Sequence, residues 1–167
     1  MSDPYSNILA AVAQVVGGNQ PDPTGKPNWF SGRDKGDSSG VASLAGCWWP
    51  PPEVLADTPV AIVLPGPSRL LQAFPMQGHK QVEDAVHVRV LAGHADLPTM
   101  LSLIAVFHDS IPAAFDTHMT LLGQPNVLAA NCGDQEFLDE ASWGGTVYIG
   151  LELVVRVERV IPVTYTA

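Results

Sequence analysis

Apolar and polar residues alternate almost without interruption along the last part of the chain, from Gly145 to Thr166. Because side chains on a strand alternate between two sides, this pattern predicts one long strand with a buried face and a wet face. The twelve residues 146–157 would span roughly 40 Å, about twice the common strand length. The predicted buried face carries Val147, Ile149, Leu151, Leu153, Val155 and Val157, and the wet face carries Tyr148, Gly150, Glu152, Arg156 and Glu158, with Val154 the one apolar exception.

Shorter apolar segments predict further strands. The β-branched run 60–64 is closed by Pro65-Gly66-Pro67, and residues 69–76 form a second, weaker candidate. Residues 82–91 alternate, with valines on one face and His87 and Arg89 on the other. Residues 127–130 are a last short strand, and a turn at Gly144-Gly145 leads into the final long one.

Two stretches have helical periodicity. The first predicted helix, about residues 3–16, begins with the Asp3-Pro4 start signal and ends at Gly17-Gly18. A second apolar stripe follows Asp96 and Pro98, and we expect it to be the only helical stripe wide enough to cover the apolar face of the final strand. Pro112 is expected to break or restart this helix, which then runs on to about Leu122. The stripe consists of Leu97, Met100, Leu101, Ile104, Phe107 and Ile111.

The order of these elements predicts an α+β fold, a mainly antiparallel sheet covered by helices on one face and ending in a long C-terminal strand. Its 167 residues are expected to form a single domain, 1–167. On this reading Leu153→Asp would be strongly destabilising, whereas Glu152→Ala would be nearly silent.

Residues 17–46 are rich in glycine, proline and polar side chains, which predicts a long irregular loop. The aromatic pair Trp29 and Phe30 lies inside it, and Trp48 and Trp49 lie at its end. Exposed aromatic residues are enriched in interfaces, so these four are candidate partner contacts. The alternative, that they fold back onto the domain's own core, stays open.

Charge narrows the classes of partner. The net charge is −9 and the pI about 4.7, which argues against a general nucleic-acid binder and against binding to an acidic membrane surface. We expect no apolar run near the ~20 residues of a membrane span and no secretory signal at the amino end. Cys47 and Cys132 lie outside any metal or redox motif and are expected to be reduced thiols.

Motifs of catalysis are missing from the sequence. It contains no HExxH, GxxxxGK[ST] or GxGxxG pattern, and its five histidines have no zinc-ligand spacing. The match to GxSxG at residues 36–40 (GDSSG) lies in the predicted irregular loop, where nothing would orient a base for the serine. The pair His108-Asp109 resembles one element of metal-dependent phosphohydrolases, but those are all-helical proteins with further ligands. We therefore expect no catalytic residue, no bound metal and no cofactor.

Four acidic residues, Asp134, Glu136, Asp139 and Glu140, fall within seven positions. Phe137 and Leu138 interrupt the alternation that a calcium loop of EF-hand type requires. A solvated acidic hairpin or loop is the default expectation. The segment is also a candidate for a channel wall or a partner surface, and these two roles stay open.

The segment from about 48 to 160 resembles the minor tail and tail terminator proteins of long-tailed bacteriophages. The resemblance is carried by the run 58–66 (TPVAIVLPG), the alternating strand 82–91, Gly93-His-Ala-Asp96 before a helix, and the ending 143–155 (WGGTVYIGLELVV). It implies a non-enzymatic virion protein that forms a ring, typically a homohexamer, at the head-proximal end of the tail tube. The implied partners are copies of itself, the major tail tube protein and a neck or head-completion protein.

The resemblance further implies synthesis in the host cytoplasm, residence in the tail or neck of the virion, and DNA passing through the ring without specific binding. A negative lumen would let DNA pass because it offers no cation to the phosphates. Two alternatives remain: a head-completion or head-tail connector protein of the neck, and a metal-dependent hydrolase that uses His108 and Asp109.

Overall fold

Two helices and five strands make up the part of the chain that the computed structural model describes, residues 4–17, 41, 44–55, 58–93 and 97–164. One sheet has the strand order β1-β2-β3-β5-β4, antiparallel except where β1 lies beside β2. This confirms the predicted α+β class. In chain order the elements are α1 (Pro4–Gly17), β1 (Cys47–Trp48), β2 (Val60–Phe74), the 3-10 turn η1 (Pro75–Gln77), β3 (His79–Ala92), α2 (Leu97–Thr117), β4 (Val127–Trp143) and β5 (Thr146–Pro162).

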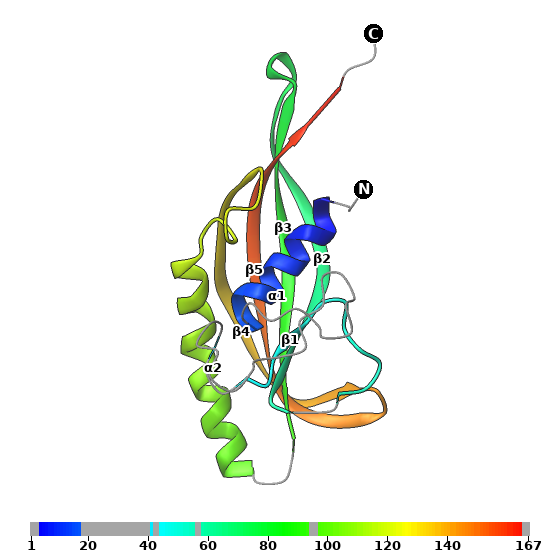
Figure 1. The fold of residues 1–167 in the computed structure, drawn as a ribbon, viewed down its shortest axis with the longest axis vertical. Helices are drawn as coiled ribbons and strands as arrows, with labels where there is room; N and C mark the ends of the chain where they lie inside the picture. The colour runs from blue at the N-terminus through cyan, green and yellow to red at the C-terminus, as the bar shows by residue number, and fades with distance from the viewer. Residues whose placement is uncertain (1–3, 18–40, 42–43, 56–57, 94–96, 165–167) are drawn as a thin grey trace.

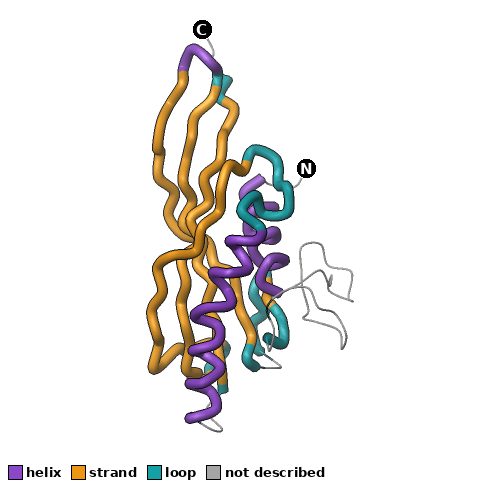
Figure 2. The backbone as a smooth tube through the Cα atoms, turned by 90° about the vertical axis from the view of Figure 1, so that its left-hand side faces the viewer, coloured by secondary structure: helices purple, strands orange, loops and turns teal. Residues whose placement is uncertain are grey.

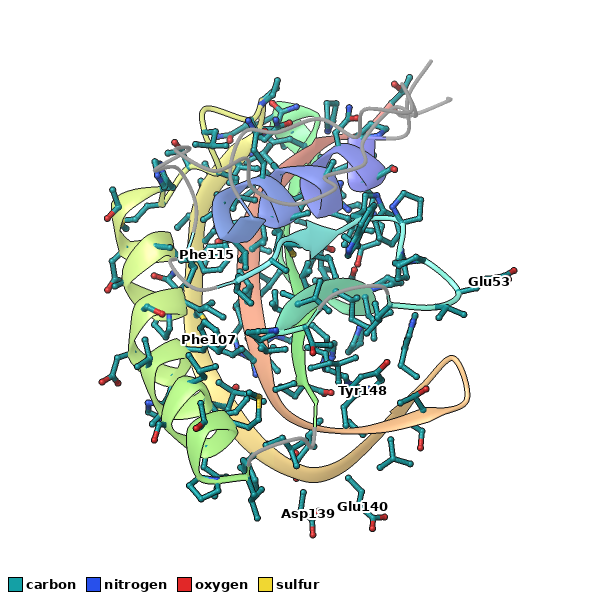
Figure 3. All side chains as sticks on the ribbon, turned by 60° about the horizontal axis from the view of Figure 1, so that its bottom comes forward. Glu53, Phe107, Phe115, Asp139, Glu140 and Tyr148 are labelled. Atoms are coloured by element: carbon teal, nitrogen blue, oxygen red, sulfur yellow. The ribbon has the colours of Figure 1, made fainter. Side chains whose placement is uncertain are left out.

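Both helices lie on the same face of the sheet (Figures 1 and 2). α1 crosses the middle strands, while α2 runs along the side of β4. The apolar residues of β3 and β5 on this face form one continuous core with both helices. Figure 3 shows Phe107 and Phe115, both fully buried, directed from α2 toward the sheet. The expectation that the α2 stripe alone covers the final strand is wrong, because α1 covers it too and Leu97 and Leu101 are exposed.

The final strand has 17 residues, and its face toward the helices is buried from Ile149 to Val157. Two assignments near its start are reversed. Val147 is 46% exposed, whereas Tyr148, on the opposite face, is 7% exposed. The reason is a second, smaller core on that opposite face, formed by Leu55, Val60, Ile62, Leu91, Ala141 and Tyr148.

β2 does not end at Pro65-Gly66-Pro67, as the sequence suggested, but continues through them to Phe74. β1 pairs with β2 only at Ala61 and Ile62, so beyond that point proline removes no ladder hydrogen bond on the outer edge. The register with β3 shifts between Pro65 and Ser68. At this shift a Cβ on Gly66 would lie 2.1 Å from the carbonyl oxygen of Ala85, so the irregularity requires glycine.

α2 likewise continues through Pro112 and ends at Thr117 rather than near Leu122. Proline cannot donate to the carbonyl four residues earlier, which here is that of His108. The Gln135 side chain on β4 donates to this carbonyl through Nε2, at 3.0 Å. The freed acceptor is therefore satisfied from outside the helix, which explains why the helix tolerates Pro112.

The end of the sheet near the C-terminus projects beyond both helices (Figures 1 and 2). We call this projection the arm, residues 70–82 and 160–163. Its strands pair from Leu70↔Val82 to Phe74↔His79 and from His79↔Pro162 to Gln81↔Val160. Because no helix covers it, Leu70, Leu71 and Met76 are exposed, Met76 almost completely at 99%.

Candidate functional surfaces

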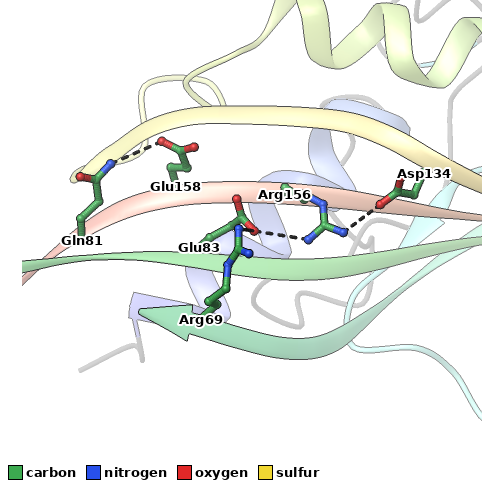
Figure 4. Close-up of polar contacts among 6 residues, drawn as sticks. All are labelled: Arg69, Gln81, Glu83, Asp134, Arg156 and Glu158. Atoms are coloured by element: carbon green, nitrogen blue, oxygen red, sulfur yellow. Dashed lines mark hydrogen bonds and ion pairs between the residues drawn. The ribbon is translucent and has the colours of Figure 1, made fainter. Parts of the chain in front are cut away.

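Charged side chains form a chain of contacts across the sheet face that the helices leave open. Arg69 on β2 contacts Glu83 on β3 at 3.0 Å, and Arg156 on β5 contacts the same carboxylate at 3.3 Å. Arg156 also contacts Asp134 on β4 at 2.8 Å, so the contacts join four strands (Figure 4). The hydrogen bond with Asp134, followed by its charge, raises the pKa of Arg156.

A second charged group lies further along the same face. Glu152 on β5 accepts two hydrogen bonds from Arg89, at 2.9 and 2.6 Å, and lies 3.0 Å from Nδ1 of His87. Burial favours a higher pKa for Glu152, but the Arg89 and His87 contacts outweigh it and the net pKa is lowered. The alternation of β3 predicted that His87 and Arg89 share a face, but only the strand register brings Glu152 opposite Arg89.

A buried ion pair lies on the other face, under the start of α1. Asp84 is fully buried and its Oδ2 is 2.5 Å from Nε of Arg159, whose side chain is 16% exposed. Ser68 donates to the other carboxylate oxygen of Asp84. The Arg159 guanidinium lies 5.4 Å from the centroid of the Tyr5 ring, a cation–π arrangement. Every group in this cluster points at another group of the cluster, which indicates a structural role.

The acidic segment lies in strand β4 of the β4–β5 hairpin, and its four acidic residues are exposed, so the expected solvated hairpin is confirmed and the loop is not. Asp134 joins the ion-pair network, whereas Glu136, Asp139 and Glu140 are exposed. In Figure 3 Asp139 and Glu140 point away from the core near the β4–β5 turn. The roles of channel wall and partner surface for this segment stay predictions.

Trp48 and Trp49 are partly buried and pack against the two cores, one on each. The indole Nε1 of Trp49 donates to Oγ of Ser6 on α1, at 3.3 Å. These positions favour the packing alternative for this pair, although a partner contact through their exposed parts stays a prediction. Trp29 and Phe30, with most of the predicted loop, lie outside the described residues.

A groove lies between α2 and β4, with a volume of about 570 Å³. Its floor is apolar, and its polar groups are the His108–Asp109 pair and Gln135. Phe137 and Leu101 are 48% and 41% exposed at its surface. Because Gln135 is held by its Nε2 bond to His108, its buried Oε1 is left without a donor among the described residues. The groove is lined by Leu101, Ile104, Ala105, His108, Asp109, Gln135, Phe137 and Leu151.

The residues that could act in catalysis or bind a metal do not form one larger cluster. His108 and Asp109 contact each other at 3.0 Å, but their side chains are 58% and 89% exposed. Within the described ranges no three His, Cys, Asp or Glu residues are grouped so as to hold a metal ion. Cys47 is buried and its thiol pKa is raised by burial. Burial, with Asp116 and Asp134, raises the pKa of Cys132 to about 12.

α2 is more apolar than the sequence analysis allowed. Its 21 residues meet the length and hydropathy of a membrane span, so the expectation that no apolar stretch reaches this length is wrong. Such helices also occur as core helices of proteins without a membrane. Its inner side packs on the sheet, and Leu97, Leu101 and Val106 are at least 41% exposed on the rest of its surface.

No protein-family model matches this chain, and no curated protein matches it.

Proposed function

We propose that the protein is a structural subunit of a phage tail terminator, which forms a ring at the head-proximal end of the tail tube and joins it to the neck. Apolar side chains exposed on two separate surfaces carry this proposal. One surface is the arm, with Leu70, Leu71 and Met76, and the other is the α2–β4 side, with Leu101 and Phe137. A subunit of a closed ring needs two different surfaces, because each copy contacts two neighbours in a head-to-tail manner.

The arrangement of charges supports a structural role over an enzymatic one. The charged groups of the open face pair with one another across β2, β3, β5 and β4, and His108 and Asp109 lie on an exposed surface. An active site concentrates perturbed, convergent groups in a cleft. We therefore propose that the protein acts without catalysis and without a cofactor.

The negative net charge of the protein also agrees with a ring through which DNA passes. With a net charge of −9, a ring of such subunits would repel DNA passing through it. The other proposed partners are the tail tube protein on one side of the ring and a neck protein on the other. The copy number is proposed to match the symmetry of the tube, with six as the expected value.

Localisation in the virion tests the proposal. An antibody against the protein should label one position, the junction of head and tail, in electron micrographs of purified virions. Phages that lack the gene should accumulate unjoined heads and tails of irregular length. Absence of the protein from virions, or labelling of the distal tail, would contradict the proposal, and labelling of tail-less heads would favour the head-completion alternative.

A further inference from the structure

Charge is divided unevenly between the two apolar surfaces. The arm, residues 70–82 and 160–163, contains no acidic residue and carries Lys80 and His79, in a chain with seventeen acidic and eight basic residues. Between Arg89 and Arg156, by contrast, the chain has no lysine or arginine. This interval includes both α2 and β4, and among the side chains that line the groove between them Asp109 is the acidic one and none is a lysine or arginine.

We propose that the arm of one copy docks in the α2–β4 groove of the next copy. This inference rests on the proposed function, and it names the two surfaces that close the ring. Apolar Met76 at the tip of the arm would occupy the apolar floor beside Leu101 and Phe137. Lys80 would lie near the Asp109 carboxylate at the rim, a favourable pairing of opposite charges.

The groove also has a polar group that such a segment would satisfy. Gln135 Oε1 is buried and, among the described residues, receives no hydrogen bond. A buried acceptor without a donor costs free energy. The arm offers donors beside its apolar tip, namely the side chains of Gln77 and Lys80 and the backbone N–H groups of the η1 turn.

The arm cannot reach the α2–β4 groove of its own copy. The arm extends past the helices at the end of the sheet that holds the C-terminus, whereas the groove lies between α2 and β4 (Figures 1 and 2). The arm is fixed to the sheet by pairing on both sides of β3. An arm that is paired into the sheet and points away from its own groove is available only to another copy, and repetition of this contact gives a ring where the rotation between copies closes.

Cross-linking between differently tagged full-length chains tests the contact. One chain carries Met76→Cys and the other Leu101→Cys. The two chains are mixed in solution in one sample and assembled onto tail preparations in another, and both samples are then mildly oxidised. The expected result is a disulfide between the two tags. The native thiols interfere little, because Cys47 is buried and the raised pKa of Cys132, about 12, keeps it protonated at pH 8.

The matched control replaces Leu101→Cys by Val106→Cys, which is exposed on α2 but outside the groove. It should cross-link at least ten-fold less. In a second measurement Lys80→Glu should weaken association several-fold at low salt, and Asp109→Lys on the other chain should restore it.

Three results would overturn the inference. The first is equal cross-linking at Val106, the second is Met76 cross-linked to Met76 in place of the groove, and the third is a chain that stays monomeric both in solution and on tails. Rings seen on tails without the Met76–Leu101 disulfide would overturn this contact and leave the proposed function intact. Absence of the protein from virions would instead overturn the proposed function, even if the disulfide formed in solution.

Discussion

The two faces of the sheet come from the same strands but are held by different interactions. On the helix side, β5 contributes Leu153 and Val155, both 0% exposed, to one continuous apolar core. On the open side, the neighbouring residues Glu152 and Arg156 join ion pairs that run from strand to strand. Apolar packing accepts many partners, whereas an ion pair requires a particular residue opposite. The comparison indicates that the helix face supplies most of the stability and that the open face specifies the strand register.

The largest expected effect follows from placing a charge in the helix-side core. Leu153→Asp would bury a carboxylate without a partner, which should lower the free energy of unfolding by about 5 kcal/mol or more. Urea denaturation followed by circular dichroism measures this loss. Leu128→Asp is the matched control, because Leu128 is 49% exposed on β4 and its change should be nearly silent. A fully stable Leu153→Asp protein would contradict the assignment of the core.

The next effect compares a buried with an exposed ion pair. Arg159→Ala leaves the fully buried carboxylate of Asp84 without its cation, and the expected loss is about 3–5 kcal/mol. Arg156→Ala removes the pair with the exposed Asp134 and one of the two cations at Glu83, which keeps Arg69, so its effect should be a small fraction of that loss. Thermal denaturation of both variants under identical conditions measures the difference. Equal losses would show that the open-face network matters more to stability than its exposure suggests.

A smaller, pH-dependent effect is expected at Glu152. Because its folded pKa is lowered, its contribution to stability is present above the unfolded value, about 4.3, and is lost as the pH falls through the folded pKa. Glu152→Gln should therefore be less stable than the parent at pH 7, and the gap should close below pH 4. The alternation of the strand predicts that Glu152→Ala is nearly silent, and the contacts with Arg89 and His87 revise that prediction. A gap that stays constant from pH 7 to pH 3 would contradict this revision.

The smallest expected effect is that of neutralising the exposed acids of β4. Asp139→Asn and Glu140→Gln together should leave the melting temperature within about 1 °C, since surface changes of this kind rarely alter stability. Addition of Asp134→Asn should lower it further, because Asp134 pairs with Arg156. Ejection of DNA and joining of tails, measured on phages with the same variants, would then separate the channel-wall role from the partner role.

Periodicity in the sequence was enough to find the helices and the long strands, because those elements bury one regular face. The face of β5 from Ile149 to Val157 and the stripe from Ile104 to Ile111 were read correctly. The ends were harder to predict. β2 passes Pro65-Gly66-Pro67 because its outer edge needs no hydrogen bond there, and that edge is a property of the assembled sheet.

The candidate surfaces were less accessible to sequence reasoning because they depend on pairs distant in the chain. Glu83 and Arg156 are 73 positions apart, and nothing in their local pattern connects them. Tyr148 was placed on the wet face since alternation cannot detect a second core that forms on both β2 and β5. The sequence alone has no lysine or arginine between Arg89 and Arg156, but only the fold places α2 and β4 of this interval on the two sides of one groove.

The bond between Gln135 and the His108 carbonyl has an evolutionary consequence. The carbonyl needs this outside donor because Pro112 lacks an N–H group. With alanine at position 112 the helix would satisfy the carbonyl by itself, and position 135 would be released from that requirement. The two positions are therefore expected to show epistasis, so that loss of the amide at 135 is harmful beside proline and tolerated beside alanine. Homologous chains should accordingly keep or change the two residues together.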